Sequence, residues 1–114
     1  MILILGAQGA GKKEYAMNLG YAEADMADGV LDEKPVLYNL QRLCFADPEH
    51  AGDMLEALCR KQAVICNEVG SGIIPLDRKE REGREATGRL CVQLAQRAEK
   101  VIRVVAGIGT VIKG

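Results

Sequence analysis

The chain has no tryptophan, one phenylalanine and three tyrosines among its 114 residues. So few aromatic side chains leave little surface on which nucleobases could stack, which argues against a single-stranded nucleic-acid binder. Positive charge is not in excess either, because 15 lysines and arginines face 16 acidic residues, for a net charge of -1. We therefore expect neither nucleic acid nor a membrane surface as a partner.

Long apolar runs are missing, although hydrophobic residues make up 48% of the chain. No run approaches the roughly 20 residues that a membrane-spanning helix needs, and residues 1–5 are too few for the core of a signal peptide. The four cysteines lack C-x-x-C spacing, so we expect buried, reduced thiols rather than a disulfide framework. These features predict a cytoplasmic protein with an aliphatic core.

Short apolar runs alternate with segments of helical periodicity along the chain. The runs lack in–out polarity, as is typical of strands buried on both faces of a parallel sheet, and they span residues 1–5, 36–40, 63–66 and 101–106. The periodic segments predict helices at residues 12–20, 47–61 and 77–99. Residues 21–35 suggest an irregular or partly helical connection, and residues 107–114 a further edge strand. This order predicts one α/β domain over residues 1–114, a three-layer sandwich with a mostly parallel sheet of four to five strands.

Single residues predict where one helix begins and how stable another is. Asp47 followed by Pro48 predicts a helix start at which the carboxylate caps backbone N–H groups. His50, the only histidine, falls in the first turn of that helix, where we expect a surface or capping role. Gly83 and Gly88 should weaken the first half of the 77–99 helix by roughly 1 kcal/mol each relative to alanine.

A glycine-rich segment between the first strand and the first helix fits the phosphate-loop pattern G-x-x-x-x-G-K. Its glycines let successive backbone N–H groups point at phosphate oxygens, and Lys12 would reach the terminal phosphates of a nucleotide. The candidate phosphate-binding residues are Gly6, Ala7, Gln8, Gly9, Ala10, Gly11, Lys12 and Lys13. The alternative is a glycine-rich turn that carries two surface lysines.

The positions that would hold Mg²⁺ beside such a loop depart from the pattern. The residue after Lys12 should be Ser or Thr, but Lys13 has no oxygen ligand and brings a positive charge to the place of the cation. A carboxylate is expected at the end of a neighbouring strand, where Asn39 offers a neutral amide. Glu68 is the remaining candidate, either as a Mg²⁺ ligand or as the group that accepts a proton from a substrate hydroxyl. Alternatively, Glu68 caps its own loop or pairs with Lys12 or Lys13.

A resemblance to a known protein family is carried by four stretches of the sequence. They are N-E-V-G-S-G-I-I-P at residues 67–75, Asp77-Arg78, Gly88-Arg89 and V-V-A-G-I at residues 104–108. The chain resembles the bifunctional adenosylcobinamide kinase/adenosylcobinamide-phosphate guanylyltransferase family of cobalamin biosynthesis, almost continuously over residues 63–113. The resemblance implies a RecA-like P-loop fold and a homotrimer. It also implies the use of ATP or GTP to phosphorylate a hydroxyl of adenosylcobinamide, before GMP is transferred to that phosphate through a histidine nucleophile.

The family's motif residues carry over at some positions and not at others. The matching positions are Gly6, Gly11 and Lys12 in the phosphate loop, Glu68 in the N-E-V-G loop, and Arg78 and Arg89 on the long helix. Arg78 and Arg89 then face a phosphate or a neighbouring subunit, or else form solvated i,i+4 pairs. The family has Ser at Lys13, Asp near Asn39 and Pro at Gly109. It also has a longer middle segment with the nucleophilic histidine, whereas residues 21–34 contain none.

These observations predict a shortened family member that binds a nucleotide or another phosphate compound. Kinase activity is expected to be weak or absent, and guanylyltransferase activity absent. Two alternatives stay open. One is an active ATP- or GTP-dependent adenosylcobinamide kinase, with Lys12 and Glu68 as catalytic residues and Mg²⁺ held by Glu68 or Asn39. The other is an oligomeric scaffold that has lost its ligand.

Overall fold

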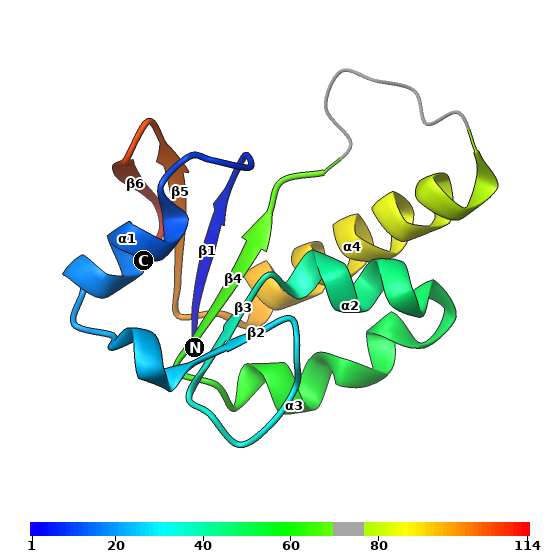
Figure 1. Ribbon diagram of the computed structural model, residues 1–114, viewed down its shortest axis with the longest axis horizontal. Coiled ribbons are helices and arrows are strands. Elements are labelled where there is room, and N and C mark those ends of the chain that lie inside the picture. Colours follow the sequence, from blue (N-terminus) through cyan, green and yellow to red (C-terminus); the bar gives the residue numbers. More distant parts are fainter. Residues whose placement is uncertain (70–76) are drawn as a thin grey trace.

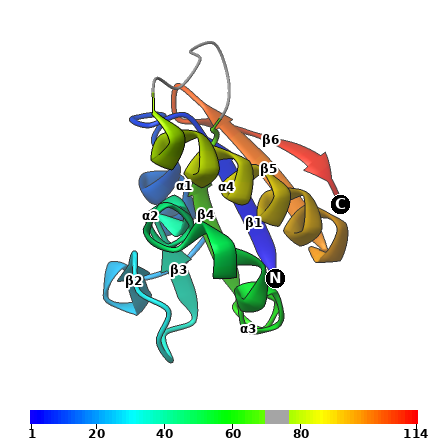
Figure 2. The same cartoon turned by 90° about the vertical axis from the view of Figure 1, so that its right-hand side faces the viewer.

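A six-stranded sheet forms the centre of the computed structural model, which describes residues 1–69 and 77–114. The strand order is β2-β3-β4-β1-β5-β6, and all neighbours are parallel except β5 and β6. The strands are β1 (Ile2–Gly6), β2 (Met26–Asp28), β3 (Val36–Tyr38), β4 (Ala63–Asn67), β5 (Lys100–Val105) and β6 (Ile108–Lys113). Figure 2 shows β2 and β6 at opposite edges of this sheet.

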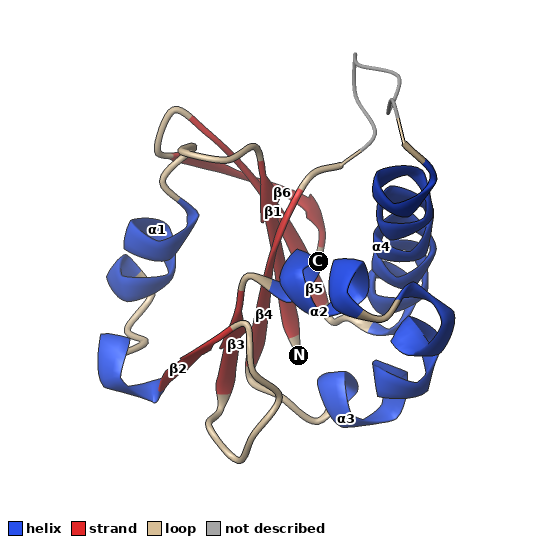
Figure 3. Cartoon of the chain, turned by 45° about the vertical axis from the view of Figure 1, so that its right-hand side comes forward, coloured by secondary structure: helices blue, strands red, loops and turns tan. Residues whose placement is uncertain are grey.

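Helices cover both faces of the sheet, so the fold has three layers (Figures 1 and 3). The helical segments are α1 (Lys12–Asn18), η1 (Glu23–Asp25), α2 (Leu40–Ala46), η2 (Pro48–Met54), α3 (Leu55–Cys59) and α4 (Arg78–Arg97). Figure 3 shows α1 on one side of the sheet and α2, α3 and α4 on the other. The predicted α/β three-layer sandwich is confirmed, with six strands in place of four to five.

Burial on both faces explains why the strands read as continuous apolar runs. In β1, the side chains of Leu3 and Ile4 point to opposite faces and both are fully buried. Leu3 packs in the cluster that includes Leu90 of α4, whereas Ile4 packs in the cluster that includes Ala16 of α1. Two aliphatic cores therefore hold the helical layers to the sheet.

Sequence patterns did not predict two of the elements, β2 and α2. Residues 21–35, expected to be irregular or partly helical, contain the short 3₁₀ helix η1 and also β2, a strand of three residues that is too short to show a period. The expected strand at residues 36–40 ends at Tyr38, because Asn39 adopts a left-handed conformation (φ 61°) and turns the chain into α2. This turn places Asn39 at the edge of the sheet where β3 ends.

The predicted helix at residues 47–61 is only partly correct. Its first part, η2, is a 3₁₀ helix, and only α3 is α-helical. Pro48 stands at the start as predicted, but the capping role of Asp47 is wrong, because its side chain makes no cap hydrogen bond. The Asp47 carboxylate instead contacts Nδ1 of His50 at 3.0 Å, and both side chains are exposed. His50 is thus a surface residue.

The cysteines are all free, as predicted. Cys44 and Cys66 are buried, while Cys59 and Cys91 are half-buried. Burial raises the pKa of the Cys44 thiol to about 11, which keeps that thiol protonated at neutral pH.

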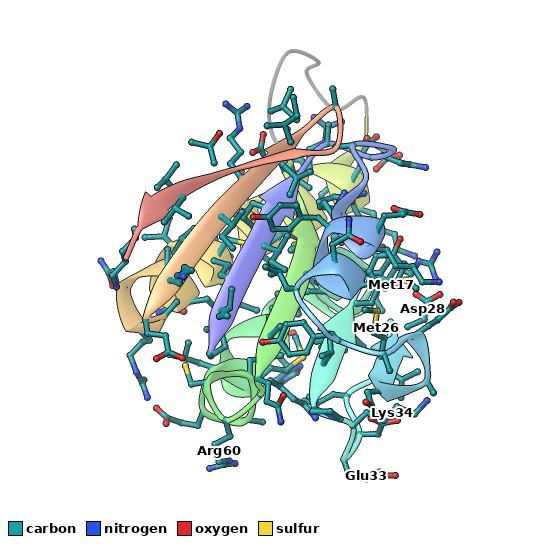
Figure 4. The ribbon with its side chains drawn as sticks, turned by 90° about the vertical axis from the view of Figure 1, so that its left-hand side faces the viewer. Met17, Met26, Asp28, Glu33, Lys34 and Arg60 are labelled. Atoms are coloured by element: carbon teal, nitrogen blue, oxygen red, sulfur yellow. The ribbon has the colours of Figure 1, made fainter. Side chains whose placement is uncertain are left out.

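The carboxyl ends of the parallel strands lie together along one edge of the sheet (Figure 1). This edge runs across the strands and is distinct from the outer strands β2 and β6. The glycine-rich segment follows β1 there, Asn39 follows β3 and Glu68 follows β4. Figure 4 shows Glu33 and Arg60 at the opposite end of the sheet, where they line a separate hollow. No helix in the described part of the chain is long and apolar enough to cross a bilayer.

Candidate functional site

The loop between β1 and α1 depends on glycine at three places. Gly9 and Gly11 have φ angles of 78° and 91°, which favour glycine. At Gly6, a Cβ atom would lie 2.6 Å from the carbonyl oxygen of Val104, so no larger residue fits between β1 and β5. A hydrogen bond of 2.7 Å from the N–H of Gly107 to the carbonyl of Ala10 ties the loop to the end of β5.

Lys12 is folded into this loop and is only 5% exposed. Its Nζ atom donates a hydrogen bond of 2.7 Å to the carbonyl oxygen of Ala7. Burial lowers the pKa of Lys12, and the negative charges of Glu68 and Glu14 partly offset this effect. The loop therefore encloses an ammonium group that has few other partners for its charge.

Lys13 has different contacts from Lys12. Its Nζ atom lies 2.7 Å from Oε1 of Glu23 in η1 and 5.8 Å from the centre of the Tyr38 ring. The hydrogen bond to Glu23 raises the pKa of Lys13. The positive charge of Lys13 is thus partly balanced by η1, a contact that the sequence did not predict.

Two hollows meet at the glycine-rich loop. The larger has a volume of about 620 Å³ and is lined by Lys12, Lys13 and Tyr38, among others. The smaller, of about 310 Å³, lies between the loop and the end of β5 and is lined by Glu68 and Arg103 as well as by loop residues 7–10. Gly9 lines both hollows, so both adjoin the glycine-rich loop.

Glu68 forms a two-point ion pair with Arg103 of β5. The Nε and Nη2 atoms of Arg103 lie 2.7 Å and 3.1 Å from the two carboxylate oxygens. This pair raises the pKa of Arg103. Of the sequence-based alternatives for Glu68, pairing with Lys12 or Lys13 is wrong, because those lysines bond to Ala7 and Glu23.

Arg103 was missed by sequence reasoning, although a signal existed. It is the one charged residue inside the apolar run of residues 101–106. Arg103 is paired in register with Leu5, next to the start of the glycine-rich loop. A lone arginine within an otherwise apolar run is therefore the feature that could have pointed to this residue.

Asn39 belongs to a hydrogen-bond network at the ends of β2, β3 and β4. Its amide nitrogen donates to Oδ1 of Asp28 at 2.6 Å, and its own oxygen accepts from Nε2 of Gln41 at 3.0 Å. The Gln41 oxygen in turn accepts from the N–H of Asn67 at 3.0 Å. Asp28, which also pairs with Arg42 at 3.1 Å, was not predicted. A carboxylate, that of Asp28, thus lies beside Asn39 at the end of the neighbouring strand.

The residues at this edge do not fit a Mg²⁺ site. Position 13 supplies an ammonium group, the Asn39 oxygen is engaged by Gln41, and the Glu68 carboxylate is neutralised by Arg103. The described residues contain no group of three or more His, Cys, Asp or Glu side chains that could hold a metal. The charged donors that these positions offer to a ligand are the cationic side chains of Lys12 and Arg103.

Arg78 and Arg89 are not brought together with the glycine-rich loop. Arg78 pairs with Glu82 at 2.8 Å along the exposed side of α4, as an i,i+4 pair. Both arginines line a separate hollow of about 370 Å³ that also contains Glu49 and Glu85. For Arg78, the interpretation as a solvated helix pair agrees with this geometry.

Comparison with known proteins identifies relatives for part of the chain. The chain is 47% identical over 53 residues to the bifunctional adenosylcobalamin biosynthesis protein CobU of Escherichia coli (strain K12). It is 45% identical over 53 residues to the protein of the same name from Salmonella typhimurium (strain LT2). Each match covers 46% of this chain and 29% of the relative, so the matched stretch spans less than a third of either relative.

A family match extends further along the chain. The sequence model of the family described as cobinamide kinase / cobinamide phosphate guanyltransferase matches residues 34–112. The glycine-rich loop at residues 6–13 lies outside this match, so its assignment depends on its own residues and geometry. Because the family match covers well over half of the chain, the chain belongs to the cobinamide kinase / cobinamide phosphate guanyltransferase family.

Proposed function

We propose that this chain is a single-domain protein that binds the phosphate groups of ATP or GTP in the loop of residues 6–13, with weak or absent kinase activity and no guanylyltransferase activity. The observation that carries the proposal is the enclosed ammonium group of Lys12, which lies 2.7 Å from the carbonyl of Ala7 in a loop with two glycines at positive φ. An anionic ligand would replace this carbonyl as the partner of Lys12 and relieve the unbalanced buried charge.

In this proposal, the residues of the site have different roles. Lys12 binds a terminal phosphate, and the loop backbone orients it. Lys13 and Tyr38 border the larger hollow, which has room for the rest of the nucleotide. No guanylyl transfer is expected, because the only histidine, His50, lies on the surface in η2 and not at this edge of the sheet.

An active kinase is the second candidate function, and one observation favours it. The carboxylate of Glu68 lines the smaller hollow next to loop residues 7–10, where it could accept a proton from an acceptor hydroxyl. A cobinamide is the acceptor that the family description suggests. Glu68 would first have to leave Arg103.

Calorimetric titration with ATP and with GTP, each with and without Mg²⁺, tests the proposed function. We expect binding that hardly depends on Mg²⁺ and that falls at least tenfold in Lys12→Ala. Lys113→Ala is a matched control, because Lys113 also donates to backbone carbonyls (Ala95 and Gln96, both 2.9 Å) but lies on β6 and lines neither hollow at the loop. Absence of binding to either nucleotide would reject the proposal and favour the scaffold.

A phosphorylation assay with adenosylcobinamide separates the two candidate functions. Turnover of wild-type protein that is lost in both Lys12→Ala and Glu68→Gln would establish the kinase.

We also propose a homotrimer, on the basis of the family resemblance, and light scattering after size-exclusion chromatography would test it.

A further inference from the structure

We propose that Arg103 is a phosphate-binding residue, which exchanges the carboxylate of Glu68 for a phosphate group when a ligand enters the smaller hollow. This inference rests on the proposed function and adds a second cationic group to it. Arg103 lies on β5, outside the glycine-rich motif. The ligand class is a phosphate carried by a small molecule, either the terminal phosphate of a nucleotide or a phosphate on a second substrate.

The first support is position. Arg103 stands opposite Leu5 in the parallel pairing of β5 with β1, so it emerges beside the start of the glycine-rich loop. Its side chain and loop residues 7–10 line the same hollow of about 310 Å³. Arg103 is 55% exposed, which leaves its guanidinium group accessible to a ligand in that hollow.

The second support is geometry. Nε and Nη2 of Arg103 already hold two oxygens of one anionic group, at 2.7 Å and 3.1 Å. A phosphate presents oxygens in a similar arrangement, and arginine binds both groups through two parallel hydrogen bonds. The carboxylate of Glu68 therefore occupies the position that a phosphate would take on Arg103.

The third support is charge. Glu68 and Arg103 are the charged residues that line the smaller hollow among the described residues, and they neutralise each other. The smaller hollow contains neither Lys12 nor Lys13 among its lining residues, so a phosphate that enters it needs a cationic group of its own. Arg103 can supply it once Glu68 is displaced. Glu68 then acts as a competitor of the ligand.

A set of four proteins tests the exchange by titration in the presence of EDTA. The proteins are wild type, Arg103→Gln, Glu68→Gln and the double variant. The probes are ATP, ADP and ethyl phosphate, a simple phosphate monoester. For the probe that reaches Arg103, we expect Glu68→Gln to bind about three- to tenfold more tightly than wild type, because the competing carboxylate is gone.

The double variant decides between phosphate binding and a purely structural role. In Arg103→Gln alone, the unpaired Glu68 would repel any phosphate, so weaker binding by that variant is not sufficient evidence. In the double variant both charges are removed. If Arg103 contacts phosphate, the double variant binds at least tenfold more weakly than Glu68→Gln. If the double variant binds as tightly as Glu68→Gln, the proposal is overturned.

Comparison of the probes identifies the source of the phosphate. A larger loss for ATP than for ADP supports contact with the terminal phosphate of the nucleotide. A loss confined to ethyl phosphate supports contact with a second substrate. Arg97→Gln is the matched control, because Arg97 forms a similar two-point pair with Glu56 (2.9 Å and 3.1 Å) and lines neither hollow at the loop.

Failure of this inference can be told apart from failure of the proposed function. If wild type binds a nucleotide and Lys12→Ala abolishes binding while the double variant matches Glu68→Gln, only the role of Arg103 is rejected. If wild type binds none of the three probes and does not bind GTP either, both proposals are rejected.

Discussion

The side-chain amide of Asn39 donates a hydrogen bond of 2.6 Å to Oδ1 of Asp28, which joins the ends of β3 and β2. Asn39 is only 8% exposed, and Arg42 contacts the same oxygen of Asp28 at 3.1 Å. The carboxylate and the amide at this edge therefore form a complementary pair. A change at one of the two positions must be matched at the other.

Exchange of the two side chains tests this complementarity. Asn39→Asp alone places a second carboxylate against Asp28 and removes the donor, so we expect a loss of about 1–3 kcal/mol in the free energy of unfolding at neutral pH. Asp28→Asn combined with Asn39→Asp restores one donor and one acceptor and should recover more than half of that loss. Urea unfolding measures both values. A single variant as stable as wild type would contradict the pairing.

Two glycines of α4 should respond in opposite directions to alanine. At Gly83, an added Cβ would lie 2.5 Å from Cδ2 of Phe45 in α2, whereas at Gly88 nothing lies within 4 Å. We expect Gly83→Ala to destabilise the protein by about 1–3 kcal/mol through overpacking. Gly88→Ala should stabilise it by about 0.5–1 kcal/mol through helix propensity. Thermal unfolding compares the two variants, and a shift of both in the same direction would show that one assignment is wrong.

The sequence predicted those parts of the fold that local patterns specify. Apolar runs gave β1, β4 and β5, and helical periodicity gave α4. The strand β2 was missed because three residues show no period, and α2 was missed because its start depends on the left-handed conformation of Asn39. At the candidate site, the motif gave the position of Lys12. The partners of Glu68 and Lys13 were not predictable, because Arg103 and Glu23 are brought to them by the tertiary fold.

The ion pair between His50 and Asp47 makes a small contribution to stability that depends on pH. The hydrogen bond to the Asp47 carboxylate raises the pKa of His50 above its ordinary value of 6.5. The folded state therefore binds the proton more tightly than the unfolded state. The contribution is fully present below about pH 6.5 and is lost as the pH rises through the folded pKa. Because His50 is the only histidine, its NMR titration is unambiguous. Asp47→Asn should lower the midpoint, because the largest cause of the raised pKa is removed. An unchanged midpoint in that variant would contradict the pairing.

Introduction of two oxygen ligands for Mg²⁺ tests why we expect nucleotide binding not to depend on this ion. Lys13→Ser supplies a hydroxyl oxygen after Lys12, and the Asp28→Asn/Asn39→Asp exchange moves the carboxylate to the end of β3 without a clash between two acids. The combined variant should bind ATP at least tenfold more tightly with Mg²⁺ than without it, while wild type shows a ratio near one.

Lys13→Ala in the same exchanged background is the control for this gain. It removes the ammonium group and its contact with Glu23 but provides no oxygen ligand. If the alanine variant gains the same Mg²⁺ dependence, relief of positive charge explains the effect and the hydroxyl does not. A strong Mg²⁺ dependence in wild type would instead show that the present residues already hold the metal. The titration therefore distinguishes a missing oxygen from an unfavourable charge at position 13.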